Sequence, residues 1–158
     1  MQHTLQISRK IDYGLRAAIY LASVAQGSVV PFREVAKLMN IPQDFLAKIL
    51  KTLVDAGLVS SVRGARGGYA LARPPAEISF LDVIEAVEGP IQVNVCLAEE
   101  GRDACGLSPA CTMYAIWKEG QDRMIEVYRA TRLDRLAMKS AQEPSLQPLH
   151  LPETPRPA

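Results

Sequence analysis

Several features are scarce in this sequence of 158 residues, and each scarcity excludes a class of protein. Three cysteines are an odd count and too few for a disulfide scaffold. No apolar run approaches the roughly 18 residues that a membrane-spanning helix needs, and residues 1–10 lack the apolar core of a secretory signal. The hydrophobic fraction of 48% argues against disorder throughout. We therefore expect a compact cytoplasmic protein whose cysteines are buried thiols or metal ligands.

An excess of one charge is also missing overall, but the net charge of +1 hides an asymmetry along the chain. Residues 1–74 carry ten basic and four acidic side chains, whereas residues 75–111 carry one basic and seven acidic side chains. A basic N-terminal half suits a module that binds a polyanion, because cations that neutralise phosphates release counterions. A basic face that is merely solvated is the alternative.

Three helices are predicted in the basic half, at residues 8–26, 32–39 and 42–57. Ser8 is a suitable N-cap for the first, and Gly27 a suitable end. In the second we expect Val35, Ala36 and Leu38 to face inward. The apolar face of the third helix is predicted to consist of Phe45, Leu46, Ile49, Leu50 and Leu53. Its opposite face presents Gln43, Asp44, Ala47, Lys48, Lys51 and Asp55.

A β-hairpin is predicted directly after the third helix. Residues 58–62 are β-prone, residues 63–68 form a glycine-rich tip with Arg63 and Arg66, and residues 69–71 are the returning strand. Three helices followed by a hairpin is the order of a winged helix-turn-helix, whose third helix enters the major groove of DNA. The fold class is therefore mainly α with a small β-hairpin wing.

The second half is predicted to hold a short helix, a long loop and a long helix. Ser79 and Asp82 form a capping box for a helix that ends at Glu88, and residues 91–111 form a loop that holds every cysteine. The helix from Thr112 has a wide apolar stripe, which a second copy of the chain or the first helix would cover. We divide the chain into a DNA-binding domain (1–75), a cysteine loop with a dimerisation helix (76–140) and a disordered proline-rich tail (141–158).

The cysteines, Cys96, Cys105 and Cys111, are spaced C-x8-C-x5-C. Structural zinc favours C-x2-C pairs and four ligands, and the two histidines lie at opposite ends of the chain. Iron-sulfur clusters need more widely separated thiolates and tolerate a different ligand at one corner. The spacing favours a cluster, with three unrelated thiols as the alternative. A cysteine nucleophile is disfavoured because no histidine is available as its base, so no enzyme activity is predicted.

Three blocks of sequence resemble a known family, the iron-sulfur winged-helix transcription regulators that include NsrR, IscR and RirA. They are residues 11–16 (IDYGLR), residues 57–69 (GLVSSVRGARGGY), and the three cysteines followed by residues 115–117 (AIW). The resemblance covers about residues 5–135. It implies a homodimer, most simply a repressor, that binds promoter DNA under the control of an iron-sulfur cluster.

The resemblance also implies roles for individual residues. Cys96, Cys105 and Cys111 would hold the cluster, and Tyr114 stands where the IscR branch has a histidine ligand. Asp12 matches the aspartate that the partner subunit supplies in NsrR, which favours [4Fe-4S] over [2Fe-2S]; an ordinary pair with Arg16 is the alternative. The DNA-contacting positions would be Gln43, Asp44, Ala47, Lys48, Lys51, Arg63, Arg66 and Tyr69.

Nitric oxide, iron supply and oxidative stress remain open as the signal, because the gap between the first two cysteines looks more like that of RirA. Two other functions remain open from the sequence. One is a metal-free winged-helix regulator whose thiols form a disulfide on oxidation. The other is an electron-transfer protein in which the wing is incidental, which the basic N-terminal half disfavours.

Overall fold

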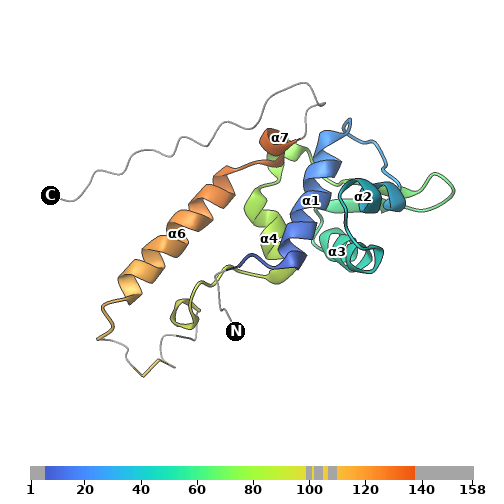
Figure 1. The fold of residues 1–158 in the computed structure, drawn as a ribbon. Coiled ribbons are helices and arrows are strands. Elements are labelled where there is room, and N and C mark those ends of the chain that lie inside the picture. Colours follow the sequence, from blue (N-terminus) through green and yellow to red (C-terminus); the bar gives the residue numbers. More distant parts are fainter. Residues whose placement is uncertain (1–5, 99–100, 102–104, 107–109, 138–158) are drawn as a thin grey trace.

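The computed structural model describes residues 6–98, 101, 105–106 and 110–137 of the chain (Figure 1). Both histidines and the predicted proline-rich tail lie outside these residues. The elements in chain order are α1 (Arg9–Ser23), α2 (Phe32–Leu38), α3 (Gln43–Asp55), β1 (Val59–Val62), β2 (Gly68–Leu71), η1 (Pro75–Glu77), α4 (Phe80–Glu88), η2 (Val95–Leu97), α6 (Tyr114–Ala130) and α7 (Leu133–Leu136), where η denotes a 3-10 helix.

Helix α1 begins where the sequence predicts. The Oγ of Ser8 accepts a hydrogen bond from the backbone N–H of Ile11 at 3.2 Å, so Ser8 is the N-cap. The same hydroxyl donates to Oε1 of Glu88, at the end of α4, at 2.5 Å. The cap therefore also ties the start of α1 to α4. The helix ends at Ser23, earlier than the predicted stop at Gly27.

Helices α2 and α3 form the predicted helix-turn-helix. The turn between them buries Ile41, whose N–H donates to the carbonyl of Ala36 at 2.9 Å. Pro42 is the N-cap of α3 rather than its first residue, because its carbonyl accepts from Phe45 and Leu46 while its own backbone is extended.

Two apolar side chains that the sequence placed inward are exposed instead. Leu38 is 54% exposed and Phe45 is 53% exposed. The buried stripe of α3 consists of Leu46, Ile49, Leu50 and Leu53. At about 3.6 residues per turn, Phe45 lies roughly a quarter turn away from this stripe. Its ring meets the edge of Tyr13 on α1, with centroids 6.0 Å apart.

The wing is a two-stranded antiparallel hairpin in which Val59 pairs with Leu71 and Val62 with Gly68. Val30, just before α2, adds an isolated bridge to Tyr69, with N–H···O distances of 2.8 and 2.9 Å. A Cβ atom on Gly68 would lie 2.1 Å from the carbonyl oxygen of Val30, so only glycine permits this approach. The base of the wing is thus bonded to the start of α2.

The hydrophobic core surrounds α1, which packs on α3 and on α4. A Cβ atom on Gly14 would lie 2.9 Å from Cγ2 of Val87, so this glycine lets α1 and α4 approach closely. The predicted capping box of α4 is confirmed, with Ser79 and Asp82 bonded reciprocally at 3.0 and 2.7 Å. Ile78, α4 and Leu133 share one core with the helix-turn-helix. The division of the chain at residue 75 stays a prediction.

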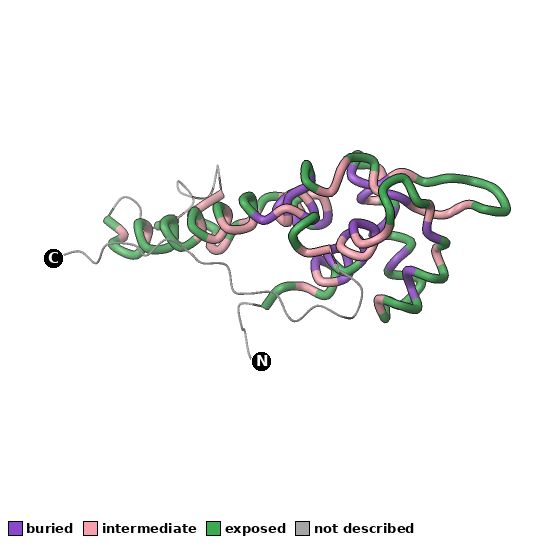
Figure 2. Tube along the Cα trace, turned by 90° about the horizontal axis from the view of Figure 1, so that it is seen from above, coloured by how far each residue is buried: buried purple, intermediate pink, exposed green. Residues whose placement is uncertain are grey.

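Helix α6 extends away from this core (Figures 1 and 2). It is 17 residues long and has no buried residue, and its apolar stripe is therefore not buried against α1. It meets α4 near its C-terminal end, where the rings of Tyr128 and Phe80 are 5.1 Å apart. Leu133 of α7 is fully buried and returns the chain to the core. In the described part of the chain, no helix has the length and apolar character needed to cross a bilayer.

Candidate nucleic-acid interface and cysteine loop

The outward face of α3 presents the positions predicted to meet DNA. Gln43, Asp44, Ala47, Lys48 and Lys51 are all exposed. Lys51 forms an ion pair with Asp55, with Nζ and Oδ2 2.6 Å apart and both side chains largely in solvent. Such an exposed pair is weak, so Lys51 remains able to exchange its carboxylate partner for a phosphate.

The wing places its two predicted arginines at an exposed tip. Arg63 and Arg66 are both exposed. Arg63 directly precedes a tight turn in which the N–H of Gly67 donates to the carbonyl of Gly64 at 2.9 Å, and Arg66 lies within that turn. Tyr69 lies lower on the hairpin, where it is half-buried. Its ring contacts Phe32 of α2, with centroids 6.5 Å apart. Tyr69 therefore supports the base of the wing, and its contact with DNA stays a prediction.

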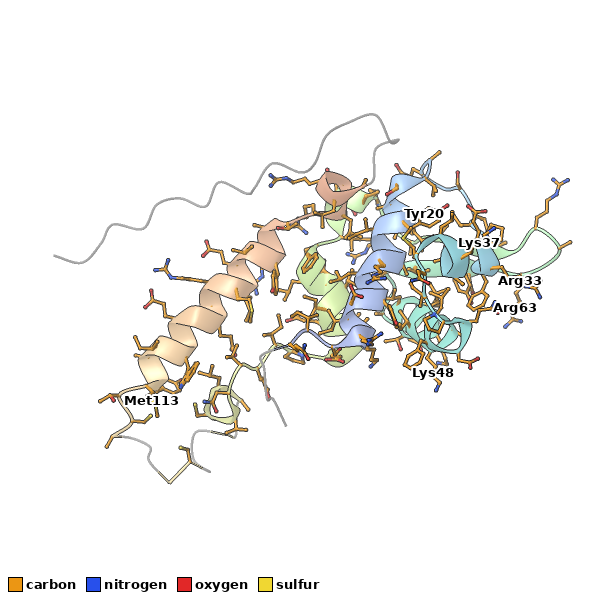
Figure 3. All side chains as sticks on the ribbon, viewed as in Figure 1. Tyr20, Arg33, Lys37, Lys48, Arg63 and Met113 are labelled. Carbon is orange, nitrogen blue, oxygen red and sulfur yellow. The ribbon has the colours of Figure 1, made fainter. Side chains whose placement is uncertain are left out.

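Two further cations lie at this end of the molecule and were missed from the sequence. Arg33 and Lys37 of α2 are exposed, and Figure 3 shows them at the same end as Lys48 and Arg63, far from Met113 at the start of α6. Their side chains form no ion pair with any described residue. Arg33 and Lys37 are four residues apart, on the face of α2 opposite to buried Val35 and Ala36. This spacing is the sequence signal that could have identified them.

Asp12 lies in the first turn of α1, where it is half-exposed. Its Oδ2 is 2.7 Å from Nη2 of Arg16, so the alternative ion pair raised from the sequence forms within the single chain. Arg16 also lies 5.7 Å from the centroid of the Tyr13 ring, and its Nη1 donates to the carbonyl of Met39 at 3.4 Å. The role of Asp12 as a ligand for a partner's cluster stays a prediction.

The three cysteines lie between α4 and α6 and are free and half-buried. Cys96 is within η2, and Cys111 comes just before α6. The loop is tied to α6 by a hydrogen bond from the N–H of Val93 to Oε1 of Gln121, at 2.9 Å. Three free thiols suit an iron-sulfur cluster chemically. The described residues do not bring three cysteine, histidine or acidic side chains together as a metal site.

An apolar cavity of about 650 Å³ is lined by the start of α1 and by residues along most of α6, from Ile116 to Tyr128. The turn at residues 89–93 forms its floor, and Ile11, Ile84, Trp117 and Met124 are among its lining residues. Ile116 and Trp117 line it and remain 70% and 37% exposed. The cysteine loop therefore adjoins apolar surface that the single chain does not cover.

Comparison with known proteins decides the family. Residues 7–139 match the Rrf2 family model, described as "Iron-dependent Transcriptional regulator". The chain belongs to the Rrf2 family. The expected likeness to NsrR, IscR and RirA is confirmed, since these are Rrf2 regulators. The winged-helix fold and the absence of enzyme function in such regulators agree with the sequence predictions.

Solved structures of Rrf2 regulators share the fold over most of their length. CymR, the global cysteine regulator of B. subtilis, is 34% identical, with a TM-score of 0.69 over 85% of this chain and 97% of that one. IscR of T. potens is 29% identical, with a TM-score of 0.69 over 89% and 93%. The oxidized form of Staphylococcus aureus CymR is 31% identical, with a TM-score of 0.67 over 85% and 98%. Rrf2 regulators bind DNA and are generally dimers.

Proposed function

We propose that this Rrf2 protein is a homodimeric transcriptional repressor whose affinity for promoter DNA is set by an iron-sulfur cluster on Cys96, Cys105 and Cys111. The observation that carries the proposal is the set of three free thiols beside helix α6, whose apolar residues the single chain leaves uncovered, in a chain of a family described as iron-dependent. The signal would be nitric oxide, iron supply or redox state.

The DNA-binding surface is formed by α3 and the wing. Helix α3 would enter the major groove with Gln43, Asp44, Ala47 and Lys48 toward the bases. Ala47 offers only a methyl group, which suits contact with a thymine methyl. Lys51, Arg63 and Arg66 would meet phosphates or the minor groove and would fix the register of the protein on the duplex.

Dimerisation is supported by the state of α6. An isolated helix of this length is marginally stable in water, and no residue of α6 is buried in the single chain. Its large exposed apolar residues are Ile116 and Trp117, with Met113 at its N-cap. A second copy with the same surface would cover them by two-fold symmetry.

Three thiolates of one protomer and Asp12 of its partner would hold a [4Fe-4S] cluster. Its loss or damage by nitric oxide, by oxidants or by iron shortage would be the signal. Cys111 leads directly into α6, and the bond from Val93 to Gln121 ties the loop to the same helix. Asp12 pairs with Arg16 in the single chain, so binding the cluster would take its carboxylate from that pair. A conformational change in the cysteine loop would thereby affect both the proposed dimerisation helix α6 and helix α1.

The test is anaerobic purification followed by visible absorption and iron and sulfide analysis. We expect a brown protein that bleaches on titration with nitric oxide or an iron chelator. A colourless protein without iron or sulfide after anaerobic cluster reconstitution would refute the cluster. The electron-transfer alternative is separated by DNA binding, because such a protein would show no preference for any duplex.

A second candidate is regulation by the thiols alone. It is favoured by three half-buried free cysteines and by the likeness to the oxidized form of Staphylococcus aureus CymR. Peroxide would then convert two thiols to a disulfide and release water. Mass spectrometry of metal-free protein after peroxide treatment tests this: a loss of two hydrogens with changed DNA affinity supports it, and unchanged affinity rejects it.

A further inference from the structure

Helix α2 carries a basic face that neither the recognition helix nor the wing accounts for. Arg33 and Lys37 are one turn apart and exposed, while Val35 and Ala36 anchor the opposite face of the helix in the core. Neither side chain has an ion pair or hydrogen bond with a described residue, whereas Lys51 on α3 is paired with Asp55. The two cations of α2 are therefore available for an anion.

The start of α2 is fixed beside the wing. The two backbone hydrogen bonds between Val30 and Tyr69 and the contact between the rings of Phe32 and Tyr69 join these segments. Arg33 follows Phe32 directly, so its position is set by the same contacts. In Figure 3, Arg33 and Lys37 lie at the end of the molecule that also carries Lys48 and Arg63. A duplex held by α3 and the wing would bring its backbone near this face, as the first helix of a helix-turn-helix crosses the backbone.

The single acidic residue of α2 is held away from these cations. The hydroxyl of Tyr20, on α1, donates to Oε1 of Glu34 at 2.7 Å. This bond, with burial and the nearby carboxylate charge adding to it, raises the pKa of Tyr20 above its usual value. Glu34 and Lys37 are three residues apart in the helix, a spacing at which opposite charges pair. Without Tyr20, Glu34 would be free to neutralise Lys37.

We propose that Arg33 and Lys37 bind phosphates of the DNA backbone beside the wing, and that Tyr20 is a positioning residue that keeps Glu34 from pairing with Lys37. The proposal rests on the proposed DNA-binding function and adds a third contact element to it. The contacts are to phosphate, so they strengthen binding to every duplex equally and do not read sequence.

The first experiment measures the dependence of DNA affinity on salt, using a short duplex of arbitrary sequence. The affinity falls as salt rises, and each lost phosphate contact reduces the magnitude of the slope of log K against log[salt] by about 0.9. Raising the salt from about 50 to 200 mM should therefore weaken binding by Arg33→Gln or by Lys37→Gln roughly threefold less than it weakens binding by the wild type. Below, a lower slope means a slope of smaller magnitude. Arg123→Gln is the matched control, because Arg123 is paired with Glu119 on distant α6. Its slope should equal that of the wild type.

A positive reference separates failure of this proposal from failure of the proposed function. If Lys51→Gln and Arg63→Gln make the salt dependence less steep while both α2 variants match the wild type, the α2 contacts are refuted and the interface of α3 and the wing stands. If none of the four variants lowers the slope, the placement of DNA on this end of the molecule is itself wrong.

The second experiment tests the positioning role of Tyr20. Tyr20→Phe removes the hydroxyl and keeps the ring, and it should lower the salt slope toward that of Lys37→Gln. Adding Glu34→Gln removes the competing carboxylate, so the double variant should recover the wild-type slope. A merely structural role for Tyr20 predicts no such recovery. An unchanged slope in Tyr20→Phe, or no recovery in the double variant, would overturn the positioning role.

Discussion

The apolar surface of α6 provides a quantitative prediction about the dimer. Ile116 is 70% exposed in the single chain, so its side chain contributes little to the stability of one protomer. Burying a whole isoleucine side chain contributes about 1.5–3 kcal/mol, and alanine retains the Cβ atom. Ile116→Ala should therefore cost about 1 kcal/mol per protomer at a covered interface. Two symmetric copies give about 2 kcal/mol, which is about a 30-fold weaker dimer.

The assay is sedimentation equilibrium over a range of protein concentrations, with thermal unfolding of each variant measured alongside. Val62→Ala is a matched control, because Val62 is also exposed and apolar, at 44%, but lies in the wing. We expect only Ile116→Ala to shift the dimer dissociation constant. An unchanged constant would show that α6 is not the dimer interface. A large loss of stability at concentrations where both proteins are monomeric would show that Ile116 packs within its own chain.

Three further predictions follow from the cysteine loop and α1. Cys105→Ala should abolish visible cluster absorption and bound iron, while the thermal midpoint of the metal-free protein is unchanged because Cys105 lies outside the core. Asp12→Ala should speed cluster loss to a chelator, measured by absorption decay, whereas Arg16→Ala should not, since it removes the ion pair and the contacts of Arg16 with Met39 and Tyr13 but leaves the carboxylate of Asp12 in place. Gly14→Ala should destabilise the fold by about 1 kcal/mol in urea unfolding, because the new Cβ would meet Val87 at 2.9 Å and overpacking outweighs the gain in helix propensity.

Each of these predictions has an outcome that contradicts it. Full iron and sulfide content in Cys105→Ala would remove that thiol from the ligand set. Equal cluster lifetimes in the wild type and Asp12→Ala would leave Asp12 as a partner of Arg16 alone. A Gly14→Ala variant as stable as the wild type would show that Val87 moves away without cost.

The helices, the wing and the caps were predictable because their signals are local. Ser8 and the pair Ser79 and Asp82 precede apolar periodicity, and the glycine-rich tip separates two β-prone runs. The burial predicted from periodicity was wrong for Leu38 and Phe45. Both lie next to the buried stripe of their helix but are not part of it. Sequence spacing alone could not decide their exposure, because it depends on where α1 crosses α2 and α3.

The candidate site was predictable only where a pattern sufficed. The outward residues of α3 and the tip arginines follow from the helix period and the hairpin turn. The position of the basic face of α2 beside the wing does not, because it depends on the bridge between Val30 and Tyr69. The proposed fourth cluster ligand is the hardest to predict. It would come from a partner subunit, and the cluster would compete with Arg16 for the carboxylate of Asp12.

The central claim is that the state of the cluster sets the affinity for DNA. The most direct test is anaerobic titration of one promoter duplex with holo protein and with the same preparation after the cluster is removed by a chelator, at fixed salt. Coupling between two sites of about 1–3 kcal/mol predicts affinities that differ by about 5- to 150-fold. Equal affinities for the holo and apo proteins would contradict the account, however firmly the cluster is bound.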